Sequence, residues 1–419
     1  TDPFNLTVDD PIALAVIQDP NFDPALEREQ QLVNQRSGLT QLSGPSSLAI
    51  SPDGNHAYVA SESLDAIVAL SRNSSNGHLT LIAQYDNAVT GFADAALDGP
   101  LHVVVSPDGS HLYAAAARDD AIVVFARNIG SGALTFVENE QQGVLGAGDA
   151  AGETNGLTGV RRLLVSPDGE WLYAAGSGAD AVAVFERDPA SGSLRFVEAE
   201  LDETDDPDDS GGAPAGMKQP SGLAVSPDGE HVYVTSRGGN AVQVFDRSEE
   251  AGDAGALSFR IAYVDGLLGV DDLVGAFGIV VSGDGDHVYV TAENEDAVVL
   301  FDRSADGSLA GRGVWRRSVA TLPGLQGAQG LAITPDGLDL FVAGLADNSL
   351  TVFERMQSNN PDGLAAGELR LRQTVFDDAG AVTSMAGPTD VTVSPDNNHV
   401  YVVANEDDAI VVFRRISPD

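Results

Sequence analysis

Histidine is the first side chain to consider for acid–base chemistry, and the chain has seven. Five of them follow one recurring four-residue phrase at the same distance, which indicates a structural role: His56, His111, His231, His287 and His399. His78 lies in a segment that we expect to be a loop. This leaves His102, in the phrase Pro100-Leu-His102, as the candidate general acid or base.

Arginines and acids supply the second kind of chemistry. The cations are almost all arginines, and a planar guanidinium can bind a carboxylate or a phosphate bidentately. We predict that Arg161 and Arg162 act with His102 at a catalytic centre. The expected binding residues around this centre are Arg118, Arg237, Glu62, Glu293 and Asp390. The alternative is that all of these are ordinary polar groups that bond to one another and to water.

Several other chemistries are excluded or weakly supported. The chain has no cysteine, so it has no disulfide, thiolate metal ligand or thiol nucleophile. A copper or zinc site built from several histidines would need more than one free histidine. The acidic run over residues 202–209 lacks the spacing of an EF-hand, and we interpret it as a solvated loop, with a calcium site as the alternative. We expect no other cofactor.

A repeated unit must position these candidates. The phrase Ser-Pro-Asp-Gly, or a close variant, starts at residues 51, 106, 166, 226, 282, 334 and 394. Proline sets φ, aspartate bonds its own backbone and glycine closes the turn, so each phrase predicts a tight turn. Seven turns at spacings of 52 to 60 residues predict seven copies of one structural unit.

Each turn stands among four short runs that are rich in β-branched and aromatic residues. Around the fourth turn these runs cover residues 223–225, 231–235, 241–245 and 257–259. Four short strands per unit, repeated seven times, predict an all-β, seven-bladed β-propeller with four-stranded blades. A solenoid is the alternative, although solenoid repeats are usually shorter.

The ends of the chain indicate how the ring closes. The seventh unit lacks room for a fourth strand before Asp419, whereas residues 37–42 read like the start of a fourth strand. We therefore predict that residues 38–43 form the outer strand of the last blade and protect its open edge. The propeller then covers residues 38–419. Residues 1–37 form an arm on the ring or on a partner, with a short helix from Asp23 to about Gln35.

Functional sites in propellers gather at one end of the central channel, where the innermost strands begin and the second strands end; we call this end the mouth. Before the innermost strands the repeat places Ser46 and Ser47, Leu101 and His102, Arg161 and Arg162, Ser221 and Gly222, Phe277 and Gly278, Gln329 and Gly330, and Thr389 and Asp390. After the second strands it places Glu62, Arg118, Ser177, Arg237, Glu293, Leu345 and Asn405. These positions differ between repeats, so they are free to specialise. The four arginines predict a positive mouth that attracts an anion.

The phrases Tyr233-Val-Thr235 and Asp120-Ala-Ile-Val-Val-Phe125, together with the recurring turns, resemble those of the lactonase-like, YVTN-type seven-bladed propellers. The resemblance covers about residues 38–415 and rests on residues that form the blade framework. It implies the propeller fold and a place among lactone hydrolases, a muconate cycloisomerase and many surface proteins. His102 stands where such propellers often carry the histidine of a Pro-x-His motif.

The charge of the chain excludes two classes of partner. It has 63 acidic and 22 basic residues and a formal net charge of −41, which repels nucleic acid and anionic lipid. No apolar run approaches the roughly 18 residues of a membrane span, so we expect no membrane insertion. The acidic surface is typical of a halotolerant protein from salty or alkaline water, with cation binding as the alternative. Together with the absence of cysteine, it favours a secreted, cell-surface or periplasmic location.

Two functions remain open from the sequence. The first is a non-catalytic binding or scaffold module outside the cytoplasm, which takes a small anionic molecule or a protein partner at the mouth. Its basis is the lengthened loops, the unshared N-terminal arm and the lack of a compact acid–base pair. The second, which the family resemblance favours, is a metal-independent lactone hydrolase or a related ring-opening enzyme.

Overall fold

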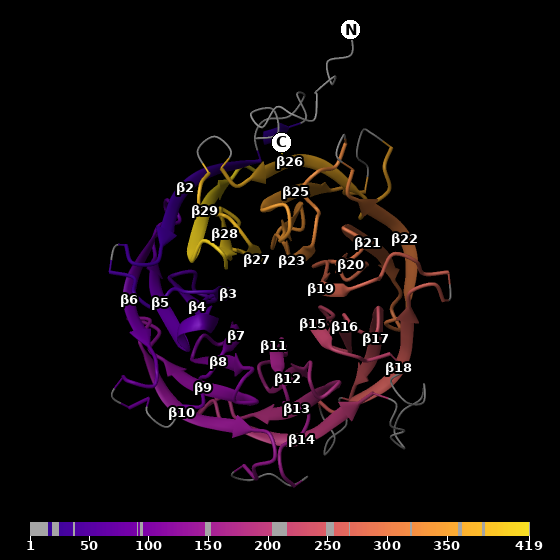
Figure 1. The fold of residues 1–419 in the computed structure, drawn as a ribbon. Helices are drawn as coiled ribbons and strands as arrows, with labels where there is room; N and C mark the ends of the chain where they lie inside the picture. Colours follow the sequence, from indigo (N-terminus) through magenta and orange to yellow (C-terminus); the bar gives the residue numbers. More distant parts are fainter. Residues whose placement is uncertain are drawn as a thin grey trace.

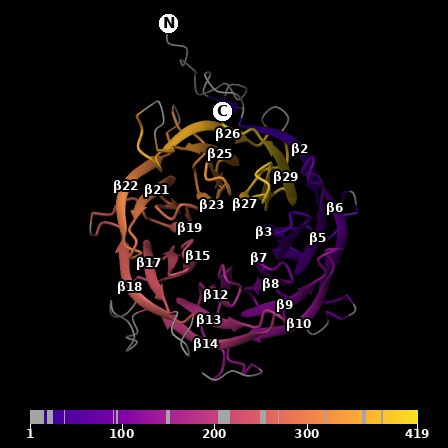
Figure 2. The ribbon, with the colours of Figure 1, turned by 180° about the vertical axis from the view of Figure 1, so that it is seen from behind.

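The computed structural model describes residues 16–18, 25–36, 38–89, 91–92, 95–146, 152–202, 216–248, 255–267, 269–318, 321–358, 363–378 and 382–418. Within these ranges seven antiparallel sheets stand around a central channel, as Figure 1 and Figure 2 show from the two faces of the ring. The predicted seven-bladed β-propeller is confirmed. No helix in the described ranges is long and apolar enough to cross a membrane.

Each blade has four strands from the channel to the outside of the ring, and one blade carries a fifth. The blades are numbered 1 to 7 in the order of their innermost strands, and in blade 7 the outermost strand comes from the N-terminal part of the chain. The innermost strands are β3 (Pro45–Ile50), β7 (Pro100–Val105), β11 (Val160–Val165), β15 (Pro220–Val225), β19 (Ala276–Val281), β23 (Ala328–Ile333) and β27 (Pro388–Val393). The second strands are β4 (His56–Ser61), β8 (His111–Ala116), β12 (Trp171–Gly176), β16 (His231–Ser236), β20 (His287–Ala292), β24 (Asp339–Gly344) and β28 (His399–Ala404). The third strands are β5 (Ala66–Arg72), β9 (Ala121–Arg127), β13 (Ala181–Arg187), β17 (Ala241–Arg247), β21 (Ala297–Arg303), β25 (Ser349–Arg355) and β29 (Ala409–Arg415). The outermost strands are β6 (Leu79–Tyr85), β10 (Leu134–Gln141), β14 (Leu194–Leu201), β18 (Leu257–Val264), β22 (Leu309–Arg316), β26 (Leu369–Phe376) and β2 (Leu26–Val33).

The apolar core is divided among the seams between blades. Seven clusters of buried hydrophobic residues occur, and each one joins side chains of two neighbouring blades. The second strands contribute most, because all six residues of each are buried. The propeller is therefore stabilised by the packing of each blade against its neighbours.

An arginine at the end of each third strand adds a polar latch to these seams. Arg127 of β9 reaches back to blade 1, where it donates to the Tyr58 hydroxyl at 2.8 Å and to Nδ1 of His56 at 2.7 Å. It also donates to the Gly109 carbonyl at 2.7 Å and pairs with Asp53 at 3.2 Å. Five seams use this arginine–tyrosine–histidine–aspartate set, which confirms that the five repeated histidines are structural.

The contacts within this latch shift the pKa values of its aspartate and its histidine. Burial alone would raise the pKa of Asp108, but the Ser106 hydroxyl, the Ser110 amide and the Arg187 guanidinium outweigh it and lower that pKa to about 2. Burial, helped by the Arg187 charge, lowers the pKa of His111. The folded protein therefore favours a charged aspartate beside a neutral histidine.

Two seams depart from the common latch. Between blades 3 and 4, Trp171 stands at the histidine position. Between blades 6 and 7, Asp339 stands there, fully buried, and pairs with Arg415 at 2.7 Å and Arg372 at 2.9 Å. The second of these seams is the one at which the N-terminal strand enters the ring.

The ring is closed by residues 26–33, not by residues 38–43 as predicted. β2 pairs with β29 as the outermost strand of blade 7, and Figure 1 shows it in indigo beside the yellow β29. Gln373 of blade 6 accepts the Leu26 amide at 2.9 Å, and Gln30 accepts the Leu79 amide of blade 1 at 2.7 Å. The predicted helix up to Gln35 is therefore wrong, because these residues complete an open sheet edge instead.

Residues 38–43 form the connection from β2 to β3 instead of a strand. Leu39 and Leu42 are fully buried in the core between blades 7 and 1. The amides of Thr40 and Gln41 donate to the Gln84 side chain rather than to a neighbouring strand. The described part of the predicted arm lies on the ring, because β1 (Val16–Gln18) pairs with β26 as a fifth strand of blade 6.

A second latch, at the mouth, fixes where each innermost strand begins. Asp120 has a φ of 51°, and its carboxylate accepts the Gly159 amide of the next blade at 2.7 Å. The equivalent residue makes the same bond in every blade: Asp65, Asp120, Asp180, Asn240, Asp296, Asn348 and Asp408. These aspartates and asparagines before the third strands therefore belong to the turn architecture. It also holds in place the strand that carries Arg161, two residues after Gly159.

Candidate functional site at the mouth

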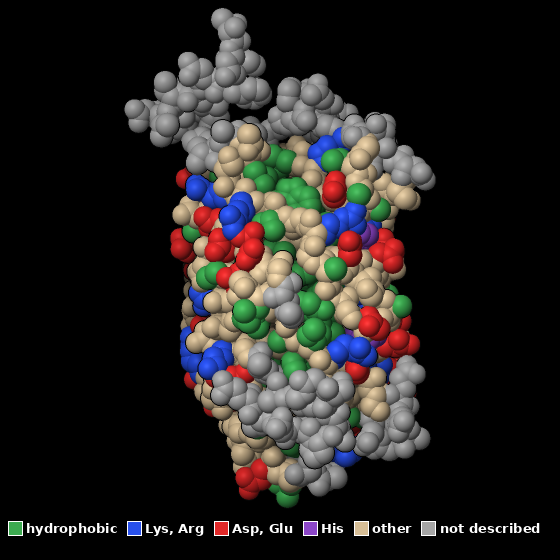
Figure 3. Space-filling view, turned by 90° about the vertical axis from the view of Figure 1, so that its right-hand side faces the viewer, with side chains coloured by type: hydrophobic (Ala, Val, Ile, Leu, Met, Phe, Trp, Pro, Cys, Tyr) green, Lys and Arg blue, Asp and Glu red, His purple; other side chains and the backbone are tan. Residues whose placement is uncertain are grey.

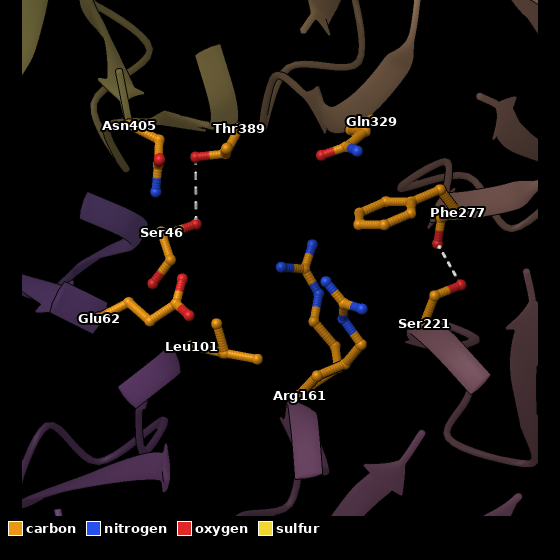
Figure 4. Close-up of a pocket in the computed structure, with 10 residues that line it drawn as sticks. Ser46, Glu62, Leu101, Arg161, Ser221, Phe277, Gln329, Thr389 and Asn405 are labelled. Atoms are coloured by element: carbon orange, nitrogen blue, oxygen red, sulfur yellow. Dashed lines mark hydrogen bonds between the residues drawn. The ribbon is translucent and has the colours of Figure 1, made fainter. Parts of the chain in front are cut away.

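A polar cavity of about 100 Å³ lies at the mouth, and Figure 4 shows its walls. Ten residues line it: Ser46, Glu62, Leu101, Arg161, Arg162, Ser221, Phe277, Gln329, Thr389 and Asn405. All ten stand at positions that the repeat assigned to the mouth. Three of the predicted site residues are among them, namely Glu62, Arg161 and Arg162. The other five lie around or beneath this cavity.

Close packing of the innermost strands builds one wall of the cavity. A side-chain carbon on Gly222 would lie 2.4 Å from the Phe277 carbonyl oxygen, so only glycine allows β15 and β19 to approach this closely. The Ser221 hydroxyl donates to that same carbonyl at 3.2 Å. These contacts place the Phe277 ring against the cavity opposite Glu62, as Figure 4 shows.

Arg161, on β11, points into the cavity (Figure 4). Its guanidinium carbon lies 5.3 Å from the centre of the Phe277 ring. Burial lowers the pKa of Arg161, and the charges of Arg237 and Arg162 lower it further, yet arginine stays protonated in proteins. Among the described residues no carboxylate lies within 4.0 Å of its nitrogens. Arg161 is therefore a cation without a bound counter-charge.

Arg118 stands at the rim of the mouth and is neutralised by acids. It is 49% exposed and has three carboxylate partners: Glu62 at 3.3 Å, Asp65 at 3.2 Å and Asp98 at 3.1 Å. Its hydrogen bonds and pairing with these acids raise the pKa of Arg118. These acids offset the positive charge that the four arginines predict for the mouth.

Arg237 is likewise neutralised, by Glu293. Two nitrogens of Arg237 contact the two carboxylate oxygens of Glu293, at 2.7 Å and 3.1 Å. Glu293 also accepts a hydrogen bond from the Gln329 amide at 3.1 Å. This two-pronged geometry fixes both side chains, and it also orients Gln329 on the cavity wall.

Arg162, which lines the cavity, faces the buried Asp390. The Arg162 guanidinium of blade 3 lies 4.0 Å from the Asp390 carboxylate of blade 7, which joins two blades that are not neighbours. Asp390 is only 7% exposed and accepts the Leu48 amide at 3.4 Å. Burial raises the pKa of Asp390, and the Arg162 charge opposes this rise.

His102 lies between blades 2 and 3 and is not among the residues that line the cavity. Its Nδ1 accepts the Leu163 amide of β11 at 3.2 Å, and the side chain is half-buried. Burial lowers the pKa of His102 well below its usual range, and the Arg162 charge lowers it further. The ring is therefore neutral with its proton on Nε2, so its basic nitrogen is already occupied.

The described residues contain one group of side chains that could ligate a metal ion. The group consists of Asp228, Glu230 and His231. Two of its members already bind Arg303 in the seam latch, at 2.8 Å and 3.0 Å. Most of the acidic run considered as a calcium site, residues 203–209, lies outside the described residues.

The sequence profile described as "Lactonase, 7-bladed beta-propeller" matches residues 25–204. Over these residues the chain is similar to the lactonase-like propellers, and it shares their seven-bladed fold. Its curated relatives include 6-phosphogluconolactonases of Formosa agariphila, 27% identical over 185 residues, and of Bacillus subtilis, 29% identical over 154 residues. These matches cover 43% and 37% of this lactonase-like propeller, and 47% and 40% of the relatives. The chain thus spans less than half the length of the curated relatives it matches.

Solved structures of similar shape carry several names. A putative 6-phosphogluconolactonase from Bacteroides uniformis has a TM-score of 0.59 at 22% identity and covers 80% of this chain and 86% of its own. A periplasmic gluconolactonase from Pseudomonas aeruginosa has a TM-score of 0.59 at 23% identity, with coverage of 81% and 86%. Hydrazine synthase from Kuenenia stuttgartiensis has a TM-score of 0.61 at 18% identity, with coverage of 92% and 99%. At these identities the likeness shows the shared fold alone.

Proposed function

We propose that this lactonase-like propeller is a metal-independent lactone hydrolase and that the mouth is its active site. The observation that carries the proposal is Arg161, an uncompensated cation that shares a small polar cavity with the Glu62 carboxylate. The two curated relatives described above are named as lactonases, which favours a hydrolase over a binding scaffold.

Lactone hydrolysis makes modest demands that these two side chains can meet. A water must be deprotonated as it attacks the carbonyl, and the oxyanion that forms must be stabilised. In the proposed reaction Glu62 takes the proton from water while Arg161 faces the oxyanion. Collapse of the tetrahedral intermediate then breaks the ring ester bond, and Glu62 returns the proton to the departing alkoxide. The product is a hydroxy acid, whose carboxylate remains beside Arg161.

The surroundings of Arg161 suit this role. The Phe277 ring holds the guanidinium on one side without taking any of its N–H donors. Partial burial reduces the competition from water, so the charge acts at a lower effective dielectric than it would on the surface. Neutral groups on the wall, including Ser46, Gln329 and Asn405, can bond hydroxyl groups of a polyol-like lactone.

His102 has a positioning role in this proposal. It binds the backbone of Leu163, on the strand that carries Arg161 and Arg162. A neutral histidine held in this way fixes the start of β11 without exchanging a proton with the substrate. Its effect on catalysis is therefore expected to be indirect.

The test is hydrolysis of glucono-δ-lactone by the full chain, measured as acid release above the spontaneous rate. We expect Arg161→Met, which removes the guanidinium but keeps an unbranched side chain, to lower kcat/KM by about 100-fold or more. Glu62→Gln should lower kcat by about the same factor. The matched control is Arg195→Met, since Arg195 is paired with Glu186 on the outer part of blade 3. A wild-type rate equal to the spontaneous rate, or full activity in Arg161→Met, would refute the proposal.

A further inference from the structure

We infer that the mouth selects a lactone that carries at most one negative charge and disfavours a phosphomonoester dianion. The inference rests on the proposed function, but it goes further by naming the substrate class. It also separates this chain from the substrate that the names of its curated relatives suggest.

The charge balance at the mouth is the starting point. Four arginines stand there, and five carboxylates lie within 4.0 Å of their nitrogens: Glu62, Asp65, Asp98, Glu293 and Asp390. Counted as fully ionised, this set carries one more negative than positive charge. A phosphate dianion would therefore enter a mouth without excess positive charge, on a chain whose formal charge is −41.

The arginines that a phosphate would need are already engaged. Arg237 offers its Nε and one terminal nitrogen to Glu293, which leaves little of its donor fork for a ligand. The guanidinium of Arg118 forms ion pairs with three carboxylates at the rim of the mouth. Arg162 faces Asp390 at 4.0 Å, which is a looser charge pair. To bind a dianion through Arg118 or Arg237, the ligand would have to displace a carboxylate that is in direct contact with the guanidinium.

Among the described residues, Arg161 is the mouth arginine with no carboxylate within 4.0 Å of its nitrogens, so it can receive a negative charge without separating an ion pair. A single guanidinium matches the one charge of a developing oxyanion or of a carboxylate product. A second charge on the same ligand would have to be placed near Glu62 or Glu293, both close enough to oppose the burial effect on the pKa of Arg161. The neutral polar groups of the cavity are the hydroxyls and amides of Ser46, Ser221, Gln329, Thr389 and Asn405, which suit neutral hydroxyl groups.

The outer side of the ring also places basic side chains beside acidic ones, as Figure 3 shows for one side. Described pairs of this kind include Arg260 with Asp246 at 2.7 Å and Arg312 with Asp302 at 2.6 Å. The pairing of arginine with acid at the mouth thus continues a pattern that is found elsewhere on this protein.

The experiment compares two lactones that differ only in the phosphate, glucono-δ-lactone and 6-phosphogluconolactone. We expect kcat/KM to be at least about tenfold higher for the unphosphorylated lactone at physiological ionic strength. Glu293→Gln should then raise the relative kcat/KM for the phosphorylated lactone, because it frees Arg237. The matched control, Glu186→Gln on β13, releases Arg195 far from the mouth and should leave the ratio unchanged.

Each outcome has a distinct meaning. Hydrolysis of neither lactone would refute the proposed function, and the inference would fall with it. Turnover of both with preference for the phosphorylated lactone would overturn the inference while leaving the proposed function intact. Preference for the unphosphorylated lactone, with an unchanged ratio in Glu293→Gln, would overturn the electrostatic cause. Preference together with the expected shift would support the inference, and calorimetry with gluconate and 6-phosphogluconate should show the same order of affinity.

Discussion

The seam latch makes a quantitative prediction about stability. Arg127 has a fully buried side chain and four polar partners, whereas Arg195 is 39% exposed and pairs with Glu186 on the outer side of a blade. Replacing either arginine by methionine removes the same charge and keeps much of the apolar stem. The structure therefore predicts very different costs for one and the same chemical change.

The magnitude follows from what each change leaves behind. Arg127→Met leaves the Gly109 carbonyl, His56 Nδ1 and the Asp53 carboxylate without their arginine partner at the seam. Breaking a buried ion pair in this way costs about 3–5 kcal/mol of stability. Arg195→Met removes an exposed pair worth about 0–1 kcal/mol. The unfolding entropy of a chain of 419 residues is about 0.9 kcal/mol per kelvin, at roughly 2.1 cal/mol per kelvin for each residue. The expected drop in Tm is thus about 3–6 °C for Arg127→Met and about 1 °C or less for Arg195→Met.

The assay is thermal unfolding followed by circular dichroism and by tryptophan fluorescence, with urea unfolding as a second measure. Coincident transitions from the two probes would show that the blades unfold together, so that the free energies are comparable. Equal shifts for the two variants would refute the reasoning, because burial would then not decide the value of the latch.

Further expectations concern closure, acid, salt and His102. Deletion of residues 1–33 removes the last outer strand and should cost several kcal/mol in urea unfolding, whereas deletion of residues 1–18 should cost much less; equal costs would contradict closure by β2. Acid should destabilise the fold in two stages. The five latch histidines have lowered pKa values, so the stability that their neutral form provides is lost as pH falls below about 6.5. Latch aspartates such as Asp108 also have lowered pKa values, so the folded state loses further stability from about pH 4 toward 2. A urea midpoint that is constant between about pH 7.5 and 5 would exclude the first stage. With a formal charge of −41, Tm should rise with NaCl up to about 0.1 M or beyond, and a stronger effect of calcium than of magnesium at equal ionic strength would reveal specific calcium sites. His102→Ala should lower kcat/KM far less than Glu62→Gln and leave the shape of its pH profile unchanged, whereas loss of one titration from the profile would make His102 a proton carrier.

The framework of the fold could be predicted because the same turn and strand pattern occurs seven times in the sequence. The turn at Ser51 recurs with the same chemistry in each blade, and the histidine that follows it recurs in five of them. Agreement among copies removes the ambiguity that one short strand would have. The mouth followed from the same register, and all ten cavity-lining residues came from the positions that the repeat assigned to it.

Ring closure by β2 was not predicted because this strand segment occurs only once, so no other copy of the repeat identifies it as a strand. Residues 26–33 are largely polar, and a proline-led start followed by glutamates and glutamines is also typical of a helix. A signal was nevertheless present: Leu26 and Gln30 repeat the spacing of Leu194 and Glu198, whose carboxylate accepts an amide of the next outer strand. The leucines at 39 and 42 were misleading, since buried linkers and strands can share a short apolar pattern.

The residue types at the mouth could be predicted from the sequence, but the ion pairs and hydrogen bonds among them could not. The sequence places Arg118 and Glu62 at the same end of the channel, yet only geometry shows that Arg118 also meets Asp65 and Asp98. In the same way, His102 stands at the expected position, but its Nδ1 faces a backbone amide of blade 3. Residue types determine which bonds are available, and the tertiary arrangement decides which of them form.

The most direct test of the central claim is a crystal structure of the protein with gluconate, the hydroxy acid that hydrolysis of glucono-δ-lactone releases. We predict that gluconate lies in the mouth with its carboxylate bound to Arg161 and with hydroxyl groups on Gln329 or Asn405. The Arg118 and Arg237 ion pairs should remain intact in that complex. Gluconate bound elsewhere on a catalytically active protein, with the mouth containing only solvent, would show that the mouth is not the active site.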